Sequence, residues 1–375
     1  MKQARKGSLK VLMVLGSLNY GGAEIFCLNF VRNIDRKKYK IDFAVSKLTN
    51  SDIEKEIASY GCKIHLVPRF NGLNIYRYKK AWKEIFANEK YDIVHGHASG
   101  AMSIYLSMAK KIGCVTIAHS HSASTRGNIL VKTAKKVLAK EIKKYSDYWF
   151  ACSDLAAIRL FGKNFESSEK YSFIPNGIVP ENYAFNPKAR SSLRKQFHIA
   201  DDEIVVGHVG SFTKPKNHSF LFKVFCELNK YLPNSYLILC GDGPLKKHYE
   251  RIANQKNNRN QIKFVGNVNN TSDYYSVFDY LVFPSHFEGL PMSLVEAQTS
   301  GLPIFCSDSI TKQICITENV HFVSLKESPK VWAKKIIDYY NSNKKRDDCL
   351  LKIKTSSFVI QNTIKTITDI YDKIN

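Results

Sequence analysis

The sequence is poor in the features that mark secreted, zinc-binding and membrane-spanning chains. Its nine cysteines never form a C-x-x-C pair, so neither a disulfide framework nor a zinc site is indicated. No uninterrupted apolar run approaches the roughly 18 residues that a membrane-spanning helix needs. The apolar run Val11 to Leu15 behind the basic start is short and leads to no convincing cleavage site, which argues against a signal peptide. These absences predict a chain that works in the cytosol.

Acidic residues are scarce relative to basic ones. The 375 residues include 56 Lys and Arg but only 33 Asp and Glu, which gives a net charge of +23. The excess is uneven, because residues 1–180 hold 30 basic and 14 acidic side chains and the remainder hold 26 and 19. A hydrophobic fraction of 44% matches a packed globular protein and excludes a disordered chain or a coiled coil. The charge leaves two kinds of partner open, nucleic acid and an anionic membrane surface.

Short apolar runs alternate with longer segments of helical period, which predicts an α/β protein with parallel sheets. The strands expected in the first half are Lys10–Leu15, Ile41–Val45, Lys63–Val67, Ile93–His95, Val115–His119, Tyr148–Cys152 and Tyr171–Ile174. Those expected in the second half are Ile204–Val209, Tyr236–Cys240, Ile262–Val265, Tyr280–Phe283 and Pro303–Cys306. The turn-rich stretch Pro175 to Pro180 suits a linker between the two series. We therefore predict two Rossmann-like, doubly wound domains that face a central ligand-binding cleft.

The most informative segment, Phe283 to Ala297, reads FPSHFEGLPMSLVEA. It follows an expected strand and opens a helix near Pro291, and the free amides at such a helix start form a potential anion site. Glu288 precedes this helix, and Glu296 interrupts its apolar side. A carboxylate there is costly unless it accepts hydrogen bonds, for example from a sugar or ribose. The alternative is that both glutamates are solvated surface residues.

This segment resembles the signature of retaining glycosyltransferase family 4, which has the GT-B architecture of two Rossmann-like domains. Shorter motifs extend the resemblance in order along the chain: Gly21-Gly22-Ala23-Glu24, Ile117–Ser122, Ala151-Cys152-Ser153, Ile174–Ile178, Lys216-Asn217-His218, Gly241–Pro244 and Phe264-Val265-Gly266. Their spacing is closest to the branch that builds bacterial capsular and exopolysaccharides. The resemblance implies transfer of a hexosyl unit, with retention, from a nucleotide-diphosphate sugar to a hydroxyl of a glycan or lipid-linked oligosaccharide. UDP is the commonest nucleotide of the family.

The resemblance also implies roles for single residues. Glu296 would hold the nucleotide ribose, Glu288 would contact hydroxyls of the donor sugar, and His119 would contact that sugar near the reacting carbon. The other donor-binding positions would be Gly21, Gly22, Lys216, Gly289, Leu290 and Met292. Lys216 would neutralise the diphosphate, with Lys214 as a second positive charge, because this chain has Ser211 where many relatives have arginine. No metal or other cofactor is expected if these groups neutralise the leaving group.

Two His-x-His pairs follow expected strands, His95 with His97 and His119 with His121. Four imidazoles could gather there at one sheet edge, and neutral imidazoles are common metal ligands. No carboxylate or cysteine cluster accompanies them, so we expect no metal. For His95, His97 and His121 we expect capping and loop hydrogen bonds instead.

The basic residues of the first half concentrate in two stretches. The segment Ile129 to Tyr145 has helical period and a lysine-rich face, formed by Lys132, Lys135, Lys136, Lys140, Lys143 and Lys144. Such a helix suits an anionic membrane surface, but an ordinary core-packing helix with a solvated basic face fits as well. A second stretch, Arg69 to Lys83 with Tyr76, Tyr78 and Trp82, favours the membrane. We therefore expect a cytoplasmic protein in peripheral contact with the inner face of the plasma membrane, where a polyprenyl-diphosphate-linked acceptor would lie.

The expected organisation is an acceptor-side domain over 1–180, a nucleotide-sugar-binding domain over 181–355, and a C-terminal helix over 356–375 that packs back on the first domain. Two other functions are weighed against the transferase. A sugar-nucleotide epimerase or phosphorylase would share the fold, but fold analogy is its only support. A basic nucleic-acid-binding protein would explain the charge, but neither the Glu288 and Glu296 motif nor the ordered glycine loops.

Overall fold

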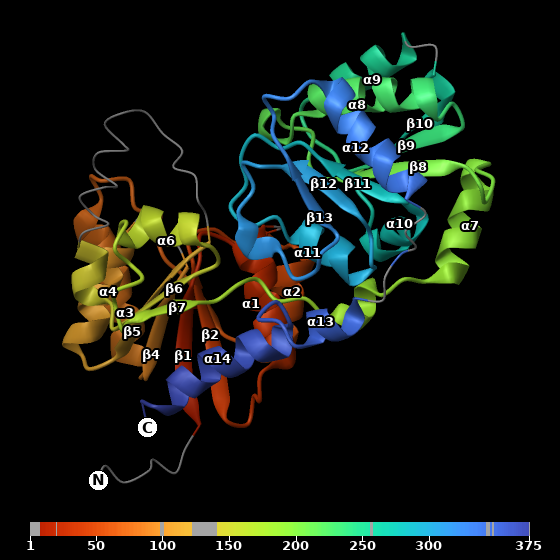
Figure 1. The fold of residues 1–375 in the computed structure, drawn as a ribbon. Helices are drawn as coiled ribbons and strands as arrows, with labels where there is room; N and C mark the ends of the chain where they lie inside the picture. The colour runs from red at the N-terminus through yellow and green to blue at the C-terminus, as the bar shows by residue number, and fades with distance from the viewer. Residues whose placement is uncertain are drawn as a thin grey trace. The chain divides into compact units, whose positions relative to one another are not determined.

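Two parallel β-sheets organise the chain, and each is built from the apolar runs expected from the sequence. The computed structural model describes residues 8–19, 21–97, 101–121, 141–255, 258–342, 346 and 349–374. The chain divides into one unit of residues 1–177 with 360–375 and a second unit of residues 178–359. Figure 1 shows strands and helices alternating in both. The expected fold class, two Rossmann-like parallel-sheet domains, is confirmed.

The first unit contains a seven-stranded sheet in the order β3-β2-β1-β4-β5-β6-β7. Its strands are β1 (Leu9–Val14), β2 (Tyr39–Val45), β3 (Ile64–Leu66), β4 (Ile93–Gly96), β5 (Val115–Ser120), β6 (Tyr148–Ala151) and β7 (Tyr171–Phe173). Its named helices are α1 (Gly22–Asn33), α2 (Asp52–Ser59), α3 (Ile75–Asn88), α4 (Met102–Lys111), α6 (Asp154–Phe161) and α14 (Ile360–Asp372). One face of the sheet packs against α3, α4 and α6 around Trp82 and Tyr105. Phe26 of α1 and Tyr371 of α14 cover the other face.

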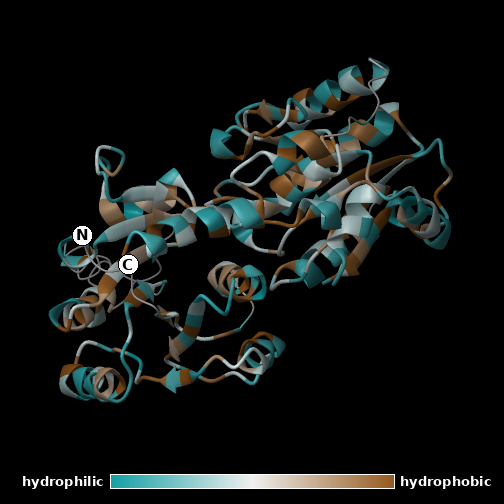
Figure 2. Cartoon of the chain, turned by 90° about the horizontal axis from the view of Figure 1, so that it is seen from below, coloured by the Kyte–Doolittle hydropathy of each residue, from teal (hydrophilic) through white to brown (hydrophobic). Residues whose placement is uncertain are grey.

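The second unit contains a six-stranded sheet in the order β10-β9-β8-β11-β12-β13. Its strands are β8 (Ile204–Val209), β9 (Ser235–Cys240), β10 (Ile262–Gly266), β11 (Tyr280–Phe283), β12 (Ile304–Ser307) and β13 (Val320–Val323). Its α-helices are α7 (Pro187–Phe197), α8 (His218–Tyr231), α9 (Lys246–Asn254), α10 (Thr271–Val277), α11 (Met292–Thr299), α12 (Pro329–Asn341) and α13 (Leu350–Lys354). Its 3₁₀ turns are η1 (Pro180–Tyr183), η2 (Lys214–Lys216), η3 (Arg259–Gln261) and η4 (Lys312–Ile314). Hydrophobic residues line its inner strands, as Figure 2 shows.

Every strand expected from the sequence forms, with bounds that shift by at most two residues. The sequence does not predict β13, because His321 interrupts this short run and most of the strand is only partly buried. In both sheets the strand order reverses once, between β1 and β4 and between β8 and β11. Loops diverge at such a reversal, and ligands of open α/β sheets bind there, beyond the carboxyl ends of the strands.

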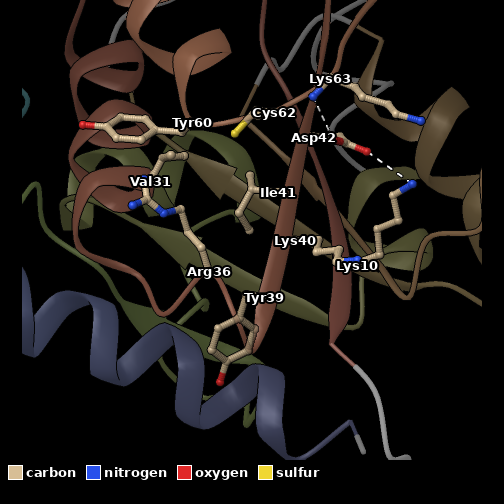
Figure 3. A pocket seen from close by; sticks show the side chains of 11 residues that line it. Lys10, Val31, Arg36, Tyr39, Lys40, Ile41, Asp42, Tyr60, Cys62 and Lys63 are labelled. Atoms are coloured by element: carbon tan, nitrogen blue, oxygen red, sulfur yellow. Dashed lines mark hydrogen bonds and ion pairs between the residues drawn. The ribbon is translucent and has the colours of Figure 1, made fainter.

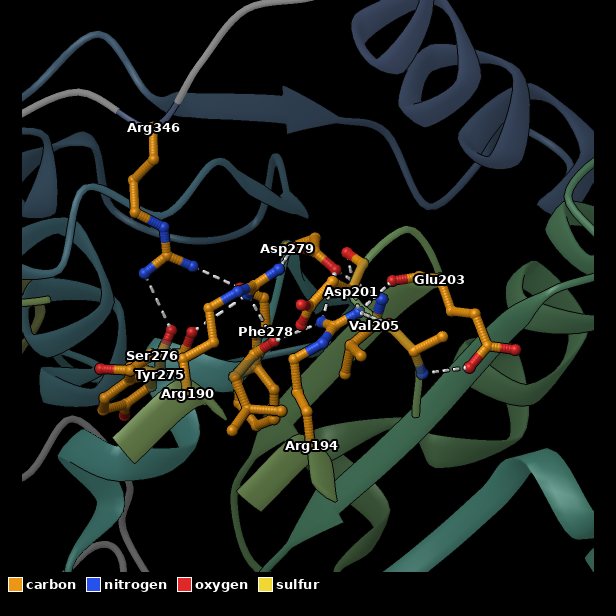
Figure 4. A network of polar contacts seen from close by, with 12 residues as sticks. Arg190, Arg194, Asp201, Glu203, Val205, Tyr275, Ser276, Phe278, Asp279 and Arg346 are labelled. Atoms are coloured by element: carbon orange, nitrogen blue, oxygen red, sulfur yellow. Dashed lines mark hydrogen bonds and ion pairs between the residues drawn. The ribbon is translucent and has the colours of Figure 1, made fainter. Parts of the chain in front are cut away.

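A buried guanidinium ties elements of the second unit together, as Figure 4 shows. Arg194 of α7 is 1% exposed, and its Nη2 donates a hydrogen bond to the carbonyl of Ala200 at 2.6 Å. The carboxylate of Asp279, directly before β11, pairs with Arg190 at 2.7 Å and accepts from the amide of Val205 in β8 at 2.7 Å. These bonds hold α7 against the two strands at which the order of this sheet reverses.

The two basic stretches differ in how much of them is described. Residues 129–140 of the expected helix lie outside the described residues, and 141–145 are helical. In the second stretch Tyr78 and Trp82 belong to the buried core, so α3 is a core-packing helix. Among the aromatic side chains of this stretch, Tyr76 is highly exposed. None of the helices in the described part of the chain is both long and apolar enough to cross a bilayer.

Candidate functional site

Four imidazoles gather at the carboxyl ends of β4 and β5. His95 and His97 lie on or just after β4, and His119 and His121 on or just after the neighbouring β5. Alternate residues of a strand face the same side, so all four rings share one face of the sheet. Nε2 of His95 lies 3.2 Å from Nδ1 of His119, and Nδ1 of His97 lies 2.7 Å from Nε2 of His121. The expectation of capping and loop bonds for His95, His97 and His121 is wrong for His95, which bonds to Tyr371 and His119, whereas His97 and His121 lie just after their strands and bond to each other.

Burial keeps this histidine cluster (His95, His97, His119 and His121) uncharged. The ring of Phe26 packs against three of the imidazoles, with centroids 5.0 to 5.8 Å apart. Burial lowers the pKa of His95 and of His121 to about 3, and it holds the pKa of His97 and of His119 well below the usual value. Neighbouring imidazoles add to the effect at His95, His97 and His119. A neutral cluster can offer hydrogen bonds to hydroxyl groups, but it adds no positive charge for a phosphate.

The cluster also bears on the question of a metal. His95, His97 and His119 each offer a ring nitrogen, and the three atoms lie within 4.8 Å of one another. Imidazole nitrogen is a ligand for zinc, copper and nickel, so the donor set fits a transition metal. The three ligands are neutral and buried, so they would leave the charge of a divalent ion uncompensated. That no metal is needed stays a prediction.

The start of α1 lies close to this cluster. Gly21 is the N-cap residue of α1, and no side chain caps the helix amides there. Nδ2 of Asn176 approaches the carbonyl of Gly22 at 3.5 Å, and Asn176 also raises the pKa of His121, although burial outweighs this effect. Gly21 has an extended φ of −169°. A Cβ on Gly21 would meet the carboxylate of Glu24, which is the mobile end of a flexible side chain and can move aside, so neither space nor backbone conformation requires glycine here.

At Gly22 too, the protein itself leaves room for a side chain. A Cβ at Gly22 would meet Nδ2 of Asn176 at 3.5 Å, which is an ordinary contact. The role expected for Gly22, close approach of a diphosphate, therefore stays a prediction. Gly21, Gly22 and the histidine cluster follow β1, β4 and β5, so they lie at the reversal of strand order in the first sheet.

In the second unit, Lys216 and Glu288 form an ion pair. Nζ of Lys216 lies 2.8 Å from Oε1 of Glu288, with side-chain exposures of 16% and 15%. The same ammonium lies 4.6 Å from the ring centroid of Phe283, at the end of β11. Lys216 follows β8 and Glu288 follows β11, so the pair lies at the strand-order reversal of this sheet. The two residues that the sequence assigns to the diphosphate and to the donor sugar are thus brought together.

Two hydrogen bonds to backbone carbonyls hold the loops that carry this pair. Asn217, which has a left-handed φ of 55°, donates from Nδ2 to the carbonyl of Pro284 at 3.1 Å. The amide of His286 donates to the carbonyl of Pro215 at 2.8 Å. A Cβ on Gly210 would lie 3.2 Å from Cε of Lys216, so the stem of this lysine packs tightly across a glycine.

Glu296 is held by tyrosines and is not the solvated residue that the alternative requires. It lies on α11, and its Oε2 accepts a hydrogen bond from the hydroxyl of Tyr275 at 2.7 Å. Burial raises the pKa of Glu296, while hydrogen bonding from Tyr275 and Tyr183 lowers it. Both tyrosines were missed by the sequence reasoning, and no motif in the sequence points to them. Whether Glu296 binds ribose stays a prediction.

The remaining predicted positions surround the start of α11. Gly289 and Leu290 are partly buried in the loop before the helix, and Met292 is its first residue. Pro291 is the N-cap residue and no side chain caps the helix, so its first amides are free for an anion. Lys214 and Ser211 are exposed, and Oγ of Ser211 lies 3.4 Å from a threonine hydroxyl.

A separate basic pocket of about 440 Å³ lies at the amino ends of β1 and β2, as Figure 3 shows. Among its lining residues the acidic one is Asp42, which accepts from the backbone amide of Lys63 at 2.9 Å and lies 3.4 Å from Nζ of Lys10. The opposite end of β1 leads to Gly21 and Gly22, which are predicted site residues. This pocket is therefore not part of the candidate site.

The GT-B class of fold has two Rossmann-like parallel-sheet units. Each unit of this chain has one reversal of strand order, with polar groups beyond it. The structure of Anabaena Alr3699/HepE in complex with UDP has the same fold, with a TM-score of 0.80 at 16% identity over 97% of this chain and 100% of that one. The model of the family "Glycosyltransferase Family 4" matches residues 20–182, and that of "Glycosyl transferases group 1" matches residues 189–354.

Relatives of known name agree with these family models. The protein of Bacillus subtilis that is named "Putative glycosyltransferase EpsF" is 33% identical over 87% of this chain and 86% of its own length. The chain therefore belongs to this glycosyltransferase family. The capsular polysaccharide biosynthesis glycosyltransferase CapH of Staphylococcus aureus is 26% identical over 88% of this chain and 90% of its own. The UDP-Gal:α-D-GlcNAc-diphosphoundecaprenol α-1,3-galactosyltransferase of Escherichia coli is 26% identical over 63% and 62%.

Proposed function

We propose that this glycosyltransferase moves a hexosyl unit from a UDP-sugar to a hydroxyl of a glycan or lipid-linked oligosaccharide, with retention, in the synthesis of a bacterial surface polysaccharide. The observation that carries the proposal is the Lys216 and Glu288 pair, which lies in the same unit as the uncapped start of α11. The UDP bound by HepE supports the donor, CapH supports the pathway, and the name of the Escherichia coli enzyme supports a lipid-linked acceptor.

The proposed roles follow from the charge of each group. A departing nucleoside diphosphate gains negative charge, which the ammonium of Lys216 and the free amides at Met292 stabilise in a preorganised site. Lys216 is paired with Glu288 in this structure, so the diphosphate replaces the carboxylate as its partner and leaves Glu288 to accept from sugar hydroxyls. Glu296 accepts from the ribose in addition to Tyr275. Neutral His119 contacts the sugar.

Peripheral membrane contact is the second part of the proposal. Leu73 is 93% exposed and Tyr76 is 82% exposed, directly before and within the first turn of α3. Exposed basic side chains follow on the same helix: Arg77, Lys79, Lys80 and Lys83. Anionic lipid attracts each nearby lysine or arginine by about 1 kcal/mol. Sedimentation with phosphatidylserine vesicles is expected to weaken with salt and with Lys79→Glu/Lys80→Glu. Unchanged binding would contradict the membrane contact.

A screen of nucleotide sugars tests the transferase activity. We expect one UDP-sugar to raise the melting temperature and to release UDP when a lipid-linked acceptor is present. Glu288→Gln and Glu296→Gln should each lose turnover, whereas Glu318→Gln, whose wild-type side chain is 97% exposed, should not. If no nucleotide sugar stabilises the protein and both site variants keep full turnover, the assignment is wrong.

A further inference from the structure

One buried imidazole of the second unit has a ring nitrogen without a partner. His208 lies in β8, and its side chain is 0% exposed. Its Nδ1 lies 2.9 Å from the backbone carbonyl of Val282 in the neighbouring strand β11. Its Nε2 is buried and has no hydrogen-bond partner in the described part of the chain. Buried polar atoms usually have a partner, so this one calls for a physical explanation.

The carbonyl of Val282 decides which nitrogen of His208 carries the proton. A carbonyl oxygen can only accept, so Nδ1 holds the proton of the neutral ring and Nε2 holds the lone pair. Burial lowers the pKa of His208 well below its usual value, and the neighbouring His218 and Lys216 lower it further. The bond to the carbonyl acts in the opposite direction but does not outweigh burial. Nε2 is therefore a hydrogen-bond acceptor that lacks a donor.

Two side chains with N–H groups, Lys216 and His218, pack close to this lone pair. A Cβ on Gly210 would lie 3.1 Å from Nε2 of His208 and 3.2 Å from Cε of Lys216, so both atoms flank the same glycine. The ring of Phe283 stacks on His208 at 5.3 Å, and the ammonium of Lys216 lies 4.6 Å from the centroid of the same ring. The ring of His218 crosses that of His208 at 72°, and neither of its nitrogens has a hydrogen-bond partner in the described residues. Of the two, Lys216 has the flexible stem that can bring a donor to Nε2.

The contact with Glu288 leaves the ammonium of Lys216 with unused donors. An ammonium has three N–H groups, and Glu288 is its ion-pair partner in the described residues, with Oε1 at 2.8 Å. This oxygen has no hydrogen-bond partner of acceptable geometry, so the contact is an ion pair and not an aligned hydrogen bond. A diphosphate that replaces Glu288 would bond to one side of the ammonium and leave another N–H free for a second acceptor.

We propose that His208 is a positioning residue for Lys216, and that its Nε2 accepts a hydrogen bond from the ammonium when Glu288 no longer holds it. The bond would fix the lysine in the site while the diphosphate binds. A neutral acceptor suits this task, because it orients the ammonium without cancelling the charge that the phosphate needs. Gly210 keeps the space between the two side chains open. The identity of the anion rests on the proposed function, and the contact between Lys216 and His208 does not.

Long-range ¹H–¹⁵N spectra of the full chain with labelled histidine test this contact without a ligand. We expect Nδ1 of His208 to give a protonated, pyrrole-type signal and Nε2 a pyridine-type signal at neutral pH. Glu288→Ala removes the partner of Lys216, so the ammonium should bond to Nε2 of His208 and move its signal upfield. Adding Lys216→Met should abolish this shift. Lys223→Met, on the exposed face of α8, is the matched control and should retain it. A protonated Nε2, or a signal that Glu288→Ala leaves in place, would overturn the proposal.

The affinity for UDP, compared with that for uridine, tests the role in binding. His208→Phe keeps a ring against Phe283 but has no lone pair. We expect the Kd of UDP to rise about tenfold while that of uridine is unchanged. In the Lys216→Met background the same change should have no further effect, because the partner of the lone pair is already gone. His208→Gln, which keeps an acceptor oxygen near the position of Nε2, should restore most of the affinity.

His218→Phe is the control for packing, since it alters the adjoining buried ring and leaves the proposed bond intact; it should bind UDP as the wild type does. Additive losses in the His208→Phe/Lys216→Met variant, or an equal loss in His218→Phe, would mean that His208 acts through the packing of β8 and not through Lys216. If the wild type binds no UDP, the proposed function fails and the ligand-free spectra decide on the contact.

Discussion

The two units present opposite chemistry at equivalent places of their sheets. In the first unit the reversal of strand order is lined by the neutral histidine cluster, and in the second it is lined by the charged pair of Lys216 and Glu288. Burial explains the difference, because His119 is 0% exposed and the ion pair keeps 15 to 16% of its side-chain surface. A sugar nucleotide combines hydroxyl groups with a charged diphosphate. In the proposed function the diphosphate meets the ammonium of Lys216, and the neutral histidine cluster offers no such charge.

Removing the positive charge of the second unit should have the largest effect. Lys216→Met leaves the developing diphosphate charge without its ammonium, and we expect kcat to fall by about 10²- to 10³-fold. The measurement is steady-state turnover of the UDP-sugar. Lys223→Met on the exposed face of α8 is the control, and it should keep the wild-type rate. If kcat of Lys216→Met falls by less than about threefold, the charge of Lys216 does not distinguish the second unit from the first.

Acid stability measures whether the first unit is uncharged. The pKa of His95 is about 3 in the fold and about 6.5 when unfolded, so the unfolded chain binds the extra proton between these values. The stability that His95 contributes is present above pH 6.5 and is lost as the pH falls toward 3. His95→Gln should therefore reduce the dependence of unfolding free energy on pH by up to about 1.4 kcal/mol per unit.

Chemical unfolding at a series of pH values provides this measurement for wild type and His95→Gln. The exposed His248 gives the control His248→Gln, which should follow the wild-type curve. A slope identical to the wild type in His95→Gln would show that His95 is charged in the fold.

The smallest effect concerns Glu296. Burial raises the pKa of Glu296 in the fold, so its stabilising contribution is full below its unfolded pKa and is lost as the pH rises through the folded pKa. Glu296→Gln removes this loss, and its melting temperature should rise relative to the wild type as the pH increases, while turnover falls. A stability gain with lost activity is typical of a site residue. A lower melting temperature at pH 8 would mean that the ionised carboxylate stabilises the fold.

Local pattern was enough to predict the strands, because each buried parallel strand is a short run of β-branched or aromatic residues. It also indicated that His95 and His119 could gather at one sheet edge, since both end expected strands, but it did not give the order of the strands. The hydrogen-bond partners of the site residues could not be predicted from the sequence. Tyr371 reaches His95 from the last helix, and Tyr275 reaches Glu296 from another element, and neither contact has a signal in local sequence. Likewise β13 was not predicted, because a partly buried edge strand needs few apolar residues and so gives a weak sequence signal.

The first unit is not continuous in the chain, since it is completed by α14 after all of residues 178–359. During synthesis, the contacts of Tyr371 with Phe30 and His95 can form only when the whole second unit has left the ribosome. The surroundings of His119 are thus finished last. A chain that stops before α14 would carry the histidine pairs and the Lys216 pair but would lack the phenol that bonds to His95. Completion of the polypeptide is in this way a condition for the complete packing around the histidine cluster.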